Sequence, residues 1–239
     1  MRVVISQAMF FPWPGFLEHV CLADVFVHYN DVQFSKGGFT NRVQVKTVNG
    51  LRWLTAPLSG LTLGQRIDEV RLDERSNWRE RHFSMIRQAY SAAPYRDDML
   101  SVLDGVYSVP CDSIAILSNL SLQALCSYFD IGRQTRFMQI GELGVEGSGS
   151  QRVLDIVTAL GGDTYVTGLG ARHYLDHEAF ERAGIQVEYM DYGKAPYTQL
   201  HGAFTPFVSS LDLLANCGRE GAKLIQPRTL SWREFLKHE

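Results

Sequence analysis

The first thirty residues restrict the fold of this chain more than any other segment. Residues 1–7 are apolar and β-branched and predict a buried strand, and residues 25–29 predict a second one. Between them, aromatic residues surround Pro12, Pro14 and Gly15, a run that excludes a helix interior because proline lacks the N–H donor. Residues 16–23 then predict a short helix. Strand, loop, helix and strand form a βαβ unit, which requires a parallel sheet.

The remaining segments extend this arrangement. Residues 42–55 alternate at period two around Asn49-Gly50, which predicts a β-hairpin, and residues 67–72 predict a short strand. Helical patterns fill residues 77–130, and strands alternate with helices again from residue 136. We therefore predict an α/β fold of three layers: a mostly parallel, Rossmann-like sheet with a β-hairpin and a helical insertion at about 77–130, in a single domain over 1–239.

Composition argues against several classes of protein. The chain has 239 residues, 45% of them hydrophobic, and a formal net charge of -3, which argues against disorder and against binding to duplex nucleic acid. No apolar run approaches the length of a membrane span, and no signal peptide is evident. The four cysteines are far apart in the sequence, so we expect neither a disulfide nor a zinc site, and a cytoplasmic location.

Polar side chains follow the first two predicted strands. Gln7 leaves the first strand, and Asp31, Gln33 and Lys36 follow the second. Parallel sheets bind ligands outside the carboxyl ends of their strands, so these groups are expected to converge beside the aromatic wall that includes Trp13. The alternative is that they satisfy loop backbone groups while the aromatic residues close the end of the sheet.

Two further segments could hold an anion. Asn41 and Arg42 place an amide beside a guanidinium, which suits a carboxylate or a phosphate, although a solvated surface turn is the commoner case for such a pair. Arg152 lies in the first turn of a predicted helix that begins at Ser148, where free amides favour anions. The competing interpretation is that Ser148 is simply an N-cap residue.

The histidines supply the candidate bases. His82 and His201 could each act as a general base near neutral pH. His173 and His177 have a metal-ligand spacing, but neither a third ligand nor an H-E-x-x-H motif accompanies them, so we expect exposed histidines at a helix start and no metal site. The sequence holds no nucleophile elbow, phosphate-binding loop or dinucleotide fingerprint.

Taken together, the segments resemble the WbqC-like family of bacterial proteins over nearly the whole chain. The opening Gln7 to Phe16 and the block Ala23 to Phe34, continuing to Asn41-Arg42, carry the resemblance most specifically. Later blocks fit as well: Trp53-Leu54-Thr55; Trp78 with His82 and Tyr90; Tyr165 with Gly168 and Tyr174; and Tyr197 to Phe204, which includes Gln199 and His201, running into Ser210 to Leu214.

The resemblance implies a tailoring function in surface-polysaccharide (O-antigen) or natural-product biosynthesis. The leading hypothesis is a transferase that forms an amide by acyl or aminoacyl transfer to an amino sugar or a related amine. Asp31, His82 or His201 would be the catalytic base. Substrate-binding residues would be Gln7, Trp13, Gln33, Lys36, Asn41, Arg42, Tyr90, Arg152, Tyr174 and Gln199. No cofactor is evident; the donor could be acyl-CoA, a carrier protein or an aminoacyl-tRNA.

Two alternatives stay open: a nucleotide-dependent, nucleotidyl-type transferase, although His19 stands alone where that class has two histidines, and a non-catalytic scaffold of a biosynthetic complex. The expected partners are a small-molecule substrate and, among macromolecules, a carrier protein or a second copy of the chain, with no membrane. Two positions depart from the family pattern, Ala8 in place of proline and Asn30 in place of aspartate. The whole hypothesis requires Gln7, Asp31, Arg42 and His201 to surround one hollow.

Overall fold

The opening strand lies in the interior of a six-stranded sheet. In the computed structural model, which describes residues 1–237, the strand order is β10-β9-β8-β1-β2-β7. All neighbours are parallel except β10, which pairs antiparallel with β9. The strands are β1 (Arg2–Ser6), β2 (Val25–His28), β7 (Arg136–Gln139), β8 (Thr164–Thr167), β9 (Gln186–Met190) and β10 (Thr229–Ser231). The predicted α/β fold with a mostly parallel sheet is confirmed.

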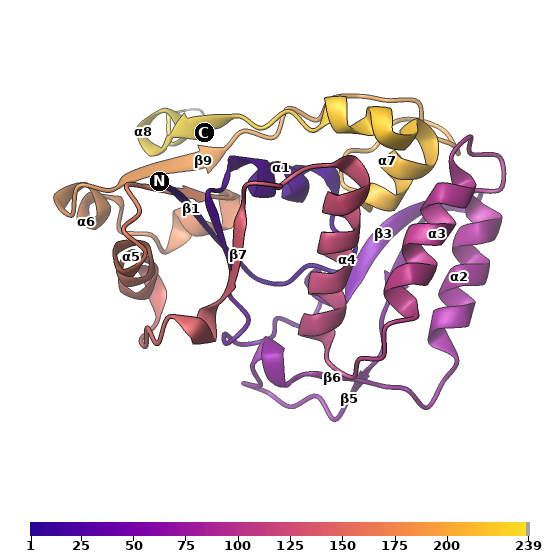
Figure 1. Cartoon of the computed structure of the whole chain (residues 1–239), viewed down its shortest axis with the longest axis horizontal. Helices are drawn as coiled ribbons and strands as arrows, with labels where there is room; N and C mark the ends of the chain where they lie inside the picture. The colour runs from indigo at the N-terminus through magenta and orange to yellow at the C-terminus, as the bar shows by residue number, and fades with distance from the viewer. Residues whose placement is uncertain (238–239) are drawn as a thin grey trace.

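Alternation along the strands gives the sheet two apolar faces. Val3 and Val4 are both buried but belong to different clusters of core residues, because successive side chains of a strand point to opposite faces. One cluster contains α1 (Pro14–Leu22) and α4 (Ile114–Phe129), and the other contains α5 (Gly149–Ala159) and α6 (His177–Arg182). The helices therefore cover both faces, in three layers (Figure 1).

The order of the strands reverses next to β1. The chain moves from β1 to β2 and β7 on one side, and then returns to build β8 and β9 on the other side. The carboxyl ends of β1 and β8 thus diverge into loops that leave in opposite directions. Such a switch point is where open α/β sheets form their ligand crevice.

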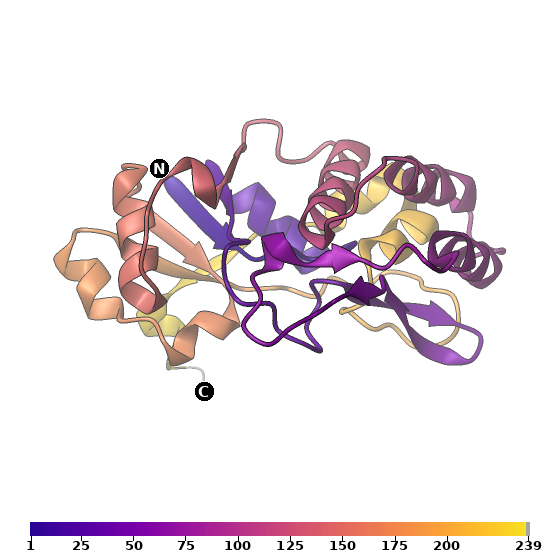
Figure 2. The ribbon, with the colours of Figure 1, turned by 90° about the horizontal axis from the view of Figure 1, so that it is seen from below.

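The hairpin and the helical insertion occupy the end of the molecule away from α5 and α6 (Figures 1 and 2). The hairpin pairs β3 (Arg42–Thr47) with β4 (Gly50–Thr55), and Gly50 has the positive φ that its turn requires. The insertion contains α2 (Trp78–Ala89), α3 (Arg96–Tyr107) and α4. A small ladder pairs β5 (Leu58–Ser59) with β6 (Arg71–Leu72).

The strand predicted over residues 67–72 is only partly correct. Residues 67–69 form the short helix η1 (Ile67–Glu69), and only Arg71–Leu72 pairs as a strand. The N–H groups of Ile67 and Asp68 donate to the carbonyls of Val32 and Asn30, so contact with the loop after β2 bends this segment. Tertiary hydrogen bonds have overridden the local pattern.

The last third of the chain contains a long irregular segment. Residues 191–209 form neither helix nor strand, and they are followed by α7 (Ser210–Cys217), η4 (Gly218–Leu224), β10 and α8 (Trp232–Phe235). Two other short helices, η2 (Ile140–Glu142) and η3 (Leu169–His173), follow β7 and β8. Within residues 1–237 no helix has both the length and the apolar character that a membrane span needs.

Candidate functional site

A cavity of about 570 Å³ lies at the carboxyl ends of β8 and β9, beside the loop that follows β1. We call it the switch-point cavity. Its lining residues come from five segments that are distant in sequence: Trp13 and His19; Gly168, Leu169, Gly170 and Arg172; Met190, Asp191, Tyr192 and Lys194; Phe207; and Leu230 and Phe235. The position agrees with the ligand crevice expected for this strand order.

Three aromatic rings build one wall of the cavity. Trp13 packs edge-on against Tyr192 at 4.9 Å and against Phe207 at 5.6 Å between ring centroids. The ammonium group of Lys194 lies 5.6 Å from the centre of the Phe207 ring. Gly15 permits this arrangement, because a Cβ built there would lie 1.9 Å from the Trp13 ring. The wall therefore offers flat apolar surface with a cation beside it.

His19 is the most unusual polar group in the cavity. It is 9% exposed, and neither ring nitrogen has a hydrogen-bond partner within the described residues. Burial lowers the pKa of His19 from 6.5 to about 4. The nearby backbone of Thr167 opposes part of this shift, although its contact with the ring does not have the geometry of a hydrogen bond. The ring edge faces Gly168, where a Cβ would lie 3.3 Å from Cε1. His19 is thus neutral at pH 7, and although the residue lines the cavity, both of its ring nitrogens are buried without a hydrogen-bond partner in the described residues.

Charged groups of both signs, Asp191 and Arg172 among them, line the cavity, and Glu18 and Arg228 interact with one another and with Asp191 near it. The guanidinium of Arg228 lies 3.5 Å from the carboxylate of Asp191, and the backbone N–H of Gln226 donates to Oε1 of Glu18 at 3.3 Å. The other carboxyl oxygen of Glu18 is buried without a partner in the described residues, and burial raises the pKa of Glu18 to about 7. Arg172 donates to the ring of His173 at 2.8 Å.

Asp31 and Arg152 do meet, but as partners of each other. The Arg152 guanidinium donates to both Asp31 oxygens at 3.1 and 2.5 Å, to the Tyr29 hydroxyl, and to the carbonyl of Val145. These bonds use the donors of Arg152 and neutralise Asp31. The expected anion site at residues 148–152 is therefore filled by the protein's own carboxylate.

The other predicted polar residues of these loops lie apart. Gln7, Gln33 and Lys36 are exposed. The Asn41 amide donates to the carbonyl of Ala56, and the Arg42 guanidinium binds the carbonyls of Gly37 and Gly38 and stacks over Trp53. Because their donors are used inside the protein, Asn41 and Arg42 fix the local loop and hairpin.

The candidate bases His82 and His201 belong to the other end of the molecule. His82 is buried on α2, where its Nδ1 contacts the Tyr107 hydroxyl at 2.9 Å, and burial lowers its pKa to about 4. His201 contacts the carbonyl of Ala89 through Nε2 at 2.6 Å. Helix α2 and helix α5, which carries the partner of Asp31, lie at opposite ends in both views (Figures 1 and 2). The single hollow around Gln7, Asp31, Arg42 and His201 is therefore not formed.

The remaining predictions have mixed outcomes. Tyr90 and Gln199 belong to a buried network with Lys46 and Asp212, away from the cavity. Tyr174 is 51% exposed beside Tyr165. Trp13 alone of the predicted substrate residues lines the switch-point cavity.

The interpretation of His177 as an exposed histidine is wrong. Trp232 of α8 stacks on it at 4.7 Å, and its Nε2 contacts the Tyr189 hydroxyl at 2.8 Å. A helix near the end of the chain covers this ring, and local sequence gives no sign of that contact. In the described part of the chain no three potential ligands are grouped as a metal site requires.

The two departures from the family pattern contact each other. The backbone N–H of Ala8 donates to the Oδ1 of Asn30 at 2.9 Å, in a buried contact between the loops after β1 and β2. Proline at position 8 would have no N–H to give. Asn30 therefore has a structural role in this chain.

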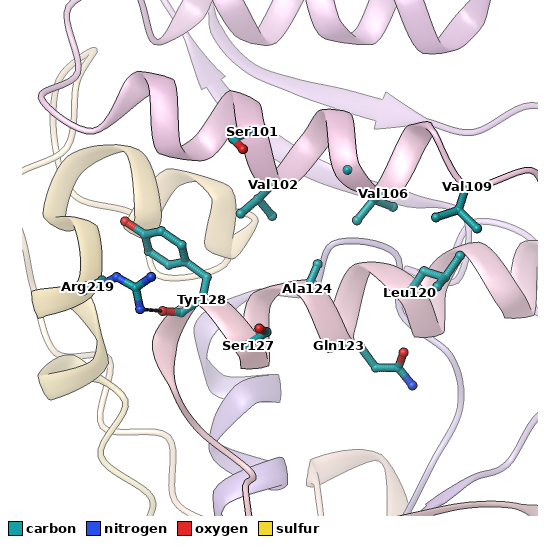
Figure 3. A pocket seen from close by; sticks show the side chains of 11 residues that line it. Ser101, Val102, Val106, Val109, Leu120, Gln123, Ala124, Ser127, Tyr128 and Arg219 are labelled. Atoms are coloured by element: carbon teal, nitrogen blue, oxygen red, sulfur yellow. Dashed lines mark hydrogen bonds between the residues drawn. The ribbon is translucent and has the colours of Figure 1, made fainter.

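A second cavity, of about 500 Å³, is an apolar groove between α3 and α4 (Figure 3). Val102, Val106 and Leu120 form its floor, and Arg219 closes one end by donating to the carbonyl of Tyr128 at 3.2 Å. The groove lies on the insertion and holds no acid, histidine or thiol among its lining residues. Because none of its lining residues is a general base near neutral pH, we assign the candidate site to the switch-point cavity.

In the sequence, His19 is noticeable only as half of an incomplete motif, and no pattern marks Lys194, Phe207 or Phe235 as site residues. The available signal was Gly168, a glycine directly after a predicted strand, which leaves room for a side chain from elsewhere.

Comparison with known proteins gives a family and no activity. The sequence model described as the WbqC-like protein family matches residues 7–224. A protein of Mycobacterium tuberculosis named "Uncharacterized protein Rv1507c" is 32% identical over 222 residues, which cover 92% of this chain and 95% of that protein. No solved structure matches this chain.

Proposed function

Because this chain belongs to the WbqC-like protein family, we propose that it is a transferase that binds a nucleoside phosphate in the switch-point cavity. The family description and the mycobacterial relative name neither a reaction nor a substrate, so the proposal depends on the chemistry of the cavity. His19 is the observation that carries it.

A buried imidazole with no partner points to a missing ligand atom. Burying a polar group without a hydrogen bond is unfavourable, and native proteins rarely leave one so. The neutral ring of His19 can donate one N–H to an anionic oxygen and accept at its other nitrogen. A phosphate oxygen that reaches the ring from the cavity would satisfy the donor, and the lack of a side chain at Gly168 keeps that approach open, because a Cβ there would lie 3.3 Å from the ring.

The rest of the cavity suits the other parts of a nucleotide. The rings of Trp13, Tyr192 and Phe207 offer surface for a base, and Lys194 places a positive charge beside that wall. A volume of about 570 Å³ is within the usual range for a small-molecule site. An aromatic base joined to an anion complements these features better than an uncharged sugar does.

Amide-forming acyl or aminoacyl transfer is the competing function. It requires a base beside the acceptor amine. The three residues considered for that role already have partners: Asp31 binds Arg152, His82 contacts Tyr107, and His201 contacts Ala89. The scaffold alternative needs an open aromatic surface, whereas Trp13 packs within the wall of a cavity. We therefore place nucleotide-dependent transfer first.

The test compares donors on the purified protein. Thermal shift and calorimetry with ATP, CTP, a uridine diphosphate sugar and acetyl-CoA should show stabilisation by a nucleoside phosphate. His19→Asn should weaken that binding by at least ~10-fold, which is about 1.4 kcal/mol. Stabilisation by acetyl-CoA, with no response to ATP, CTP or the nucleotide sugar, would establish the competing function instead.

The matched control is His28→Asn. His28 is also buried, has an Nε2 atom without a partner in the described residues, and has its pKa lowered to about 4 by burial. It lies on β2 and does not line the switch-point cavity. Equal loss of nucleotide binding in both variants would mean that His19 acts only through stability and would contradict the proposal.

A further inference from the structure

The loop that carries Trp13 contains a strained residue. Phe11 has φ 40°, a left-handed conformation that a bulky side chain rarely adopts, and its ring is fully buried. Such a conformation persists only where the surrounding structure holds it, and it is often found close to functional sites. Phe11 follows β1 and precedes Trp13 by two residues, at the switch point of the sheet.

Two buried serine hydroxyls hold the backbone of Phe11 from both sides. The N–H of Phe11 donates to Oγ of Ser121 at 2.8 Å, and Oγ of Ser209 donates to the carbonyl of Phe11 at 2.8 Å. Both serines have no exposed surface. They belong to α4 and to the N-cap of α7, so two separate helices fix the backbone of one residue.

The constraint continues to the wall of the cavity. The N–H of Ser210 donates to the carbonyl of Pro12 at 2.8 Å, and the N–H of Phe16 donates to the carbonyl of Trp13 at 2.9 Å. The backbone from Phe11 to Trp13 is therefore bonded at each residue. With its backbone fixed, the Trp13 ring is restricted to its place over Gly15 and against Tyr192.

From this geometry we infer that Ser121 and Ser209 are positioning residues, whose hydroxyls hold Phe11 in its left-handed conformation and thereby set the aromatic wall of the switch-point cavity before a ligand binds. That the cavity binds a nucleoside phosphate rests on the proposed function. If the aromatic wall is already in place, a ligand does not have to order it on binding, so the entropy cost of binding is smaller. Loss of one hydroxyl should therefore weaken binding although neither serine lines the cavity.

The test is Ser121→Ala against Ser118→Ala. Ser118 lies on the same helix, is 1% exposed, and donates through Oγ to the carbonyl of Thr40 at 2.9 Å. Each variant leaves one buried backbone group without a partner, so both should lower the Tm by about 2–4 °C. Only Ser121→Ala removes a hydrogen bond to Phe11, leaving its N–H without the Ser121 acceptor.

Fluorine NMR of protein labelled with 5-fluorotryptophan reports on the surroundings of Trp13 in the absence of a ligand. The chain has four tryptophans, and Trp13→Phe assigns the resonance of Trp13. Ser121→Ala should shift or broaden that resonance and raise the Kd for ATP or CTP at least ~5-fold, whereas Ser118→Ala should change neither. An unmoved Trp13 resonance in folded Ser121→Ala would overturn the inference.

The two proposals can fail separately. A Trp13 resonance that responds to Ser121→Ala in a protein that binds no nucleoside phosphate would reject the proposed function and keep the positioning role. Nucleotide binding that is equal in the wild type, Ser121→Ala and Ser118→Ala would reject the positioning role. Should Ser121→Ala fail to fold, Ser121→Cys gives the same comparison, because a thiol accepts a hydrogen bond only weakly.

Discussion

Buried histidines should make this protein sensitive to acid. Burial lowers the pKa values of His19, His28 and His82 from 6.5 to about 4. Below pH 6.5 the unfolded chain takes up protons at these positions while the folded chain does not, so folding free energy is lost as the pH falls from 6.5 towards 4. Each ring contributes roughly 2–3 kcal/mol over that window.

His82→Gln tests this dependence. The variant should be less stable at pH 7, by about 1–2 kcal/mol, because the contact with Tyr107 is altered. It should nevertheless lose less free energy of unfolding than the wild type between pH 7 and pH 5. Urea unfolding at both pH values measures the difference, and identical losses in the two proteins would refute the assignment of a lowered pKa.

Glu18 should act in the opposite direction. Burial raises its pKa from 4.5 to about 7, so the unfolded chain releases this proton at a lower pH than the folded chain does. Stability contributed by protonated Glu18 is present at low pH and is lost as the pH rises through 7. Glu18→Gln should therefore stabilise the protein at pH 8, by about 1–2 kcal/mol after allowing for the nearby charge of Arg228, and have less effect at pH 5. Unfolding at pH 8 that shows no gain would contradict a raised pKa of Glu18.

At the scale of elements, the second residue of helix α1 is a glycine that its surroundings require. Gly15→Ala ordinarily favours a helix, but here the new methyl group would meet the Trp13 ring at 1.9 Å. We expect the variant to lose about 1–2 kcal/mol and to displace Trp13. Gly105→Ala is the control, because Gly105 lies within α3 with no atom within 4 Å of its built Cβ, and should gain about 0.5–1 kcal/mol. Equal effects in denaturant unfolding would show that the indole can move aside freely.

The last helix should set the size of the cavity. Phe235 of α8 stacks on Tyr189 at 4.1 Å between ring centroids and lines the switch-point cavity. Phe235→Ala should open that end and change the Kd for nucleoside phosphates by ~3-fold or more, with the largest change for the bulkiest ligand. Leu236→Ala, at an exposed neighbour, should bind as the wild type does. Calorimetry that gives the same Kd for both variants would exclude α8 from the site.

The elements that sequence predicted are those with a strong local pattern. The βαβ opening, the hairpin around Asn49-Gly50 and the helices of the insertion have periodic burial that follows from their own residues. Segments such as β10 and α8 contain three and four residues. Pairing with β9 fixes β10, and stacking of its aromatic rings on α6 and β9 fixes α8. Short elements of this kind depend on tertiary contacts, which a local pattern does not contain.

The sequence predicted a site at the carboxyl ends of the first two strands. The switch-point cavity lies instead at the carboxyl ends of β8 and β9, and Trp13 is the predicted residue that lines it. Arg152 and Asp31 were expected to serve a ligand, but they neutralise each other. The role of His19 depends on Gly168, which lies beyond the insertion in sequence, so no inspection of α1 alone could reveal it.

At the scale of the whole molecule, α7 joins the two ends of the fold. Its first residues hold the loop after β1 through Ser209 and Ser210, while Asp212 accepts hydrogen bonds from Tyr90 of the insertion and Tyr197 of the long irregular segment. Lys46 of the hairpin binds the same segment through Gln199 and two carbonyls. This buried network is polar and is satisfied internally, so its members depend on one another.

Removing the charge at the centre of that network should destabilise the entire chain. Burial raises the pKa of Asp212, while its two tyrosine donors and the charge of Lys46 favour the ionised form. The tyrosine hydroxyls each donate to one oxygen of Asp212, and in Asp212→Asn one of those oxygens becomes an NH₂ group that faces a donor. We therefore expect the free energy of unfolding to fall by about 2–4 kcal/mol. Asp104→Asn, at an exposed position of α3, should stay within about 0.5 kcal/mol of the wild type. Because α7 bonds to both ends, Asp212→Asn should still unfold in one transition by circular dichroism and by tryptophan fluorescence. Two separated transitions, or no loss of stability, would show that the ends fold independently of this helix.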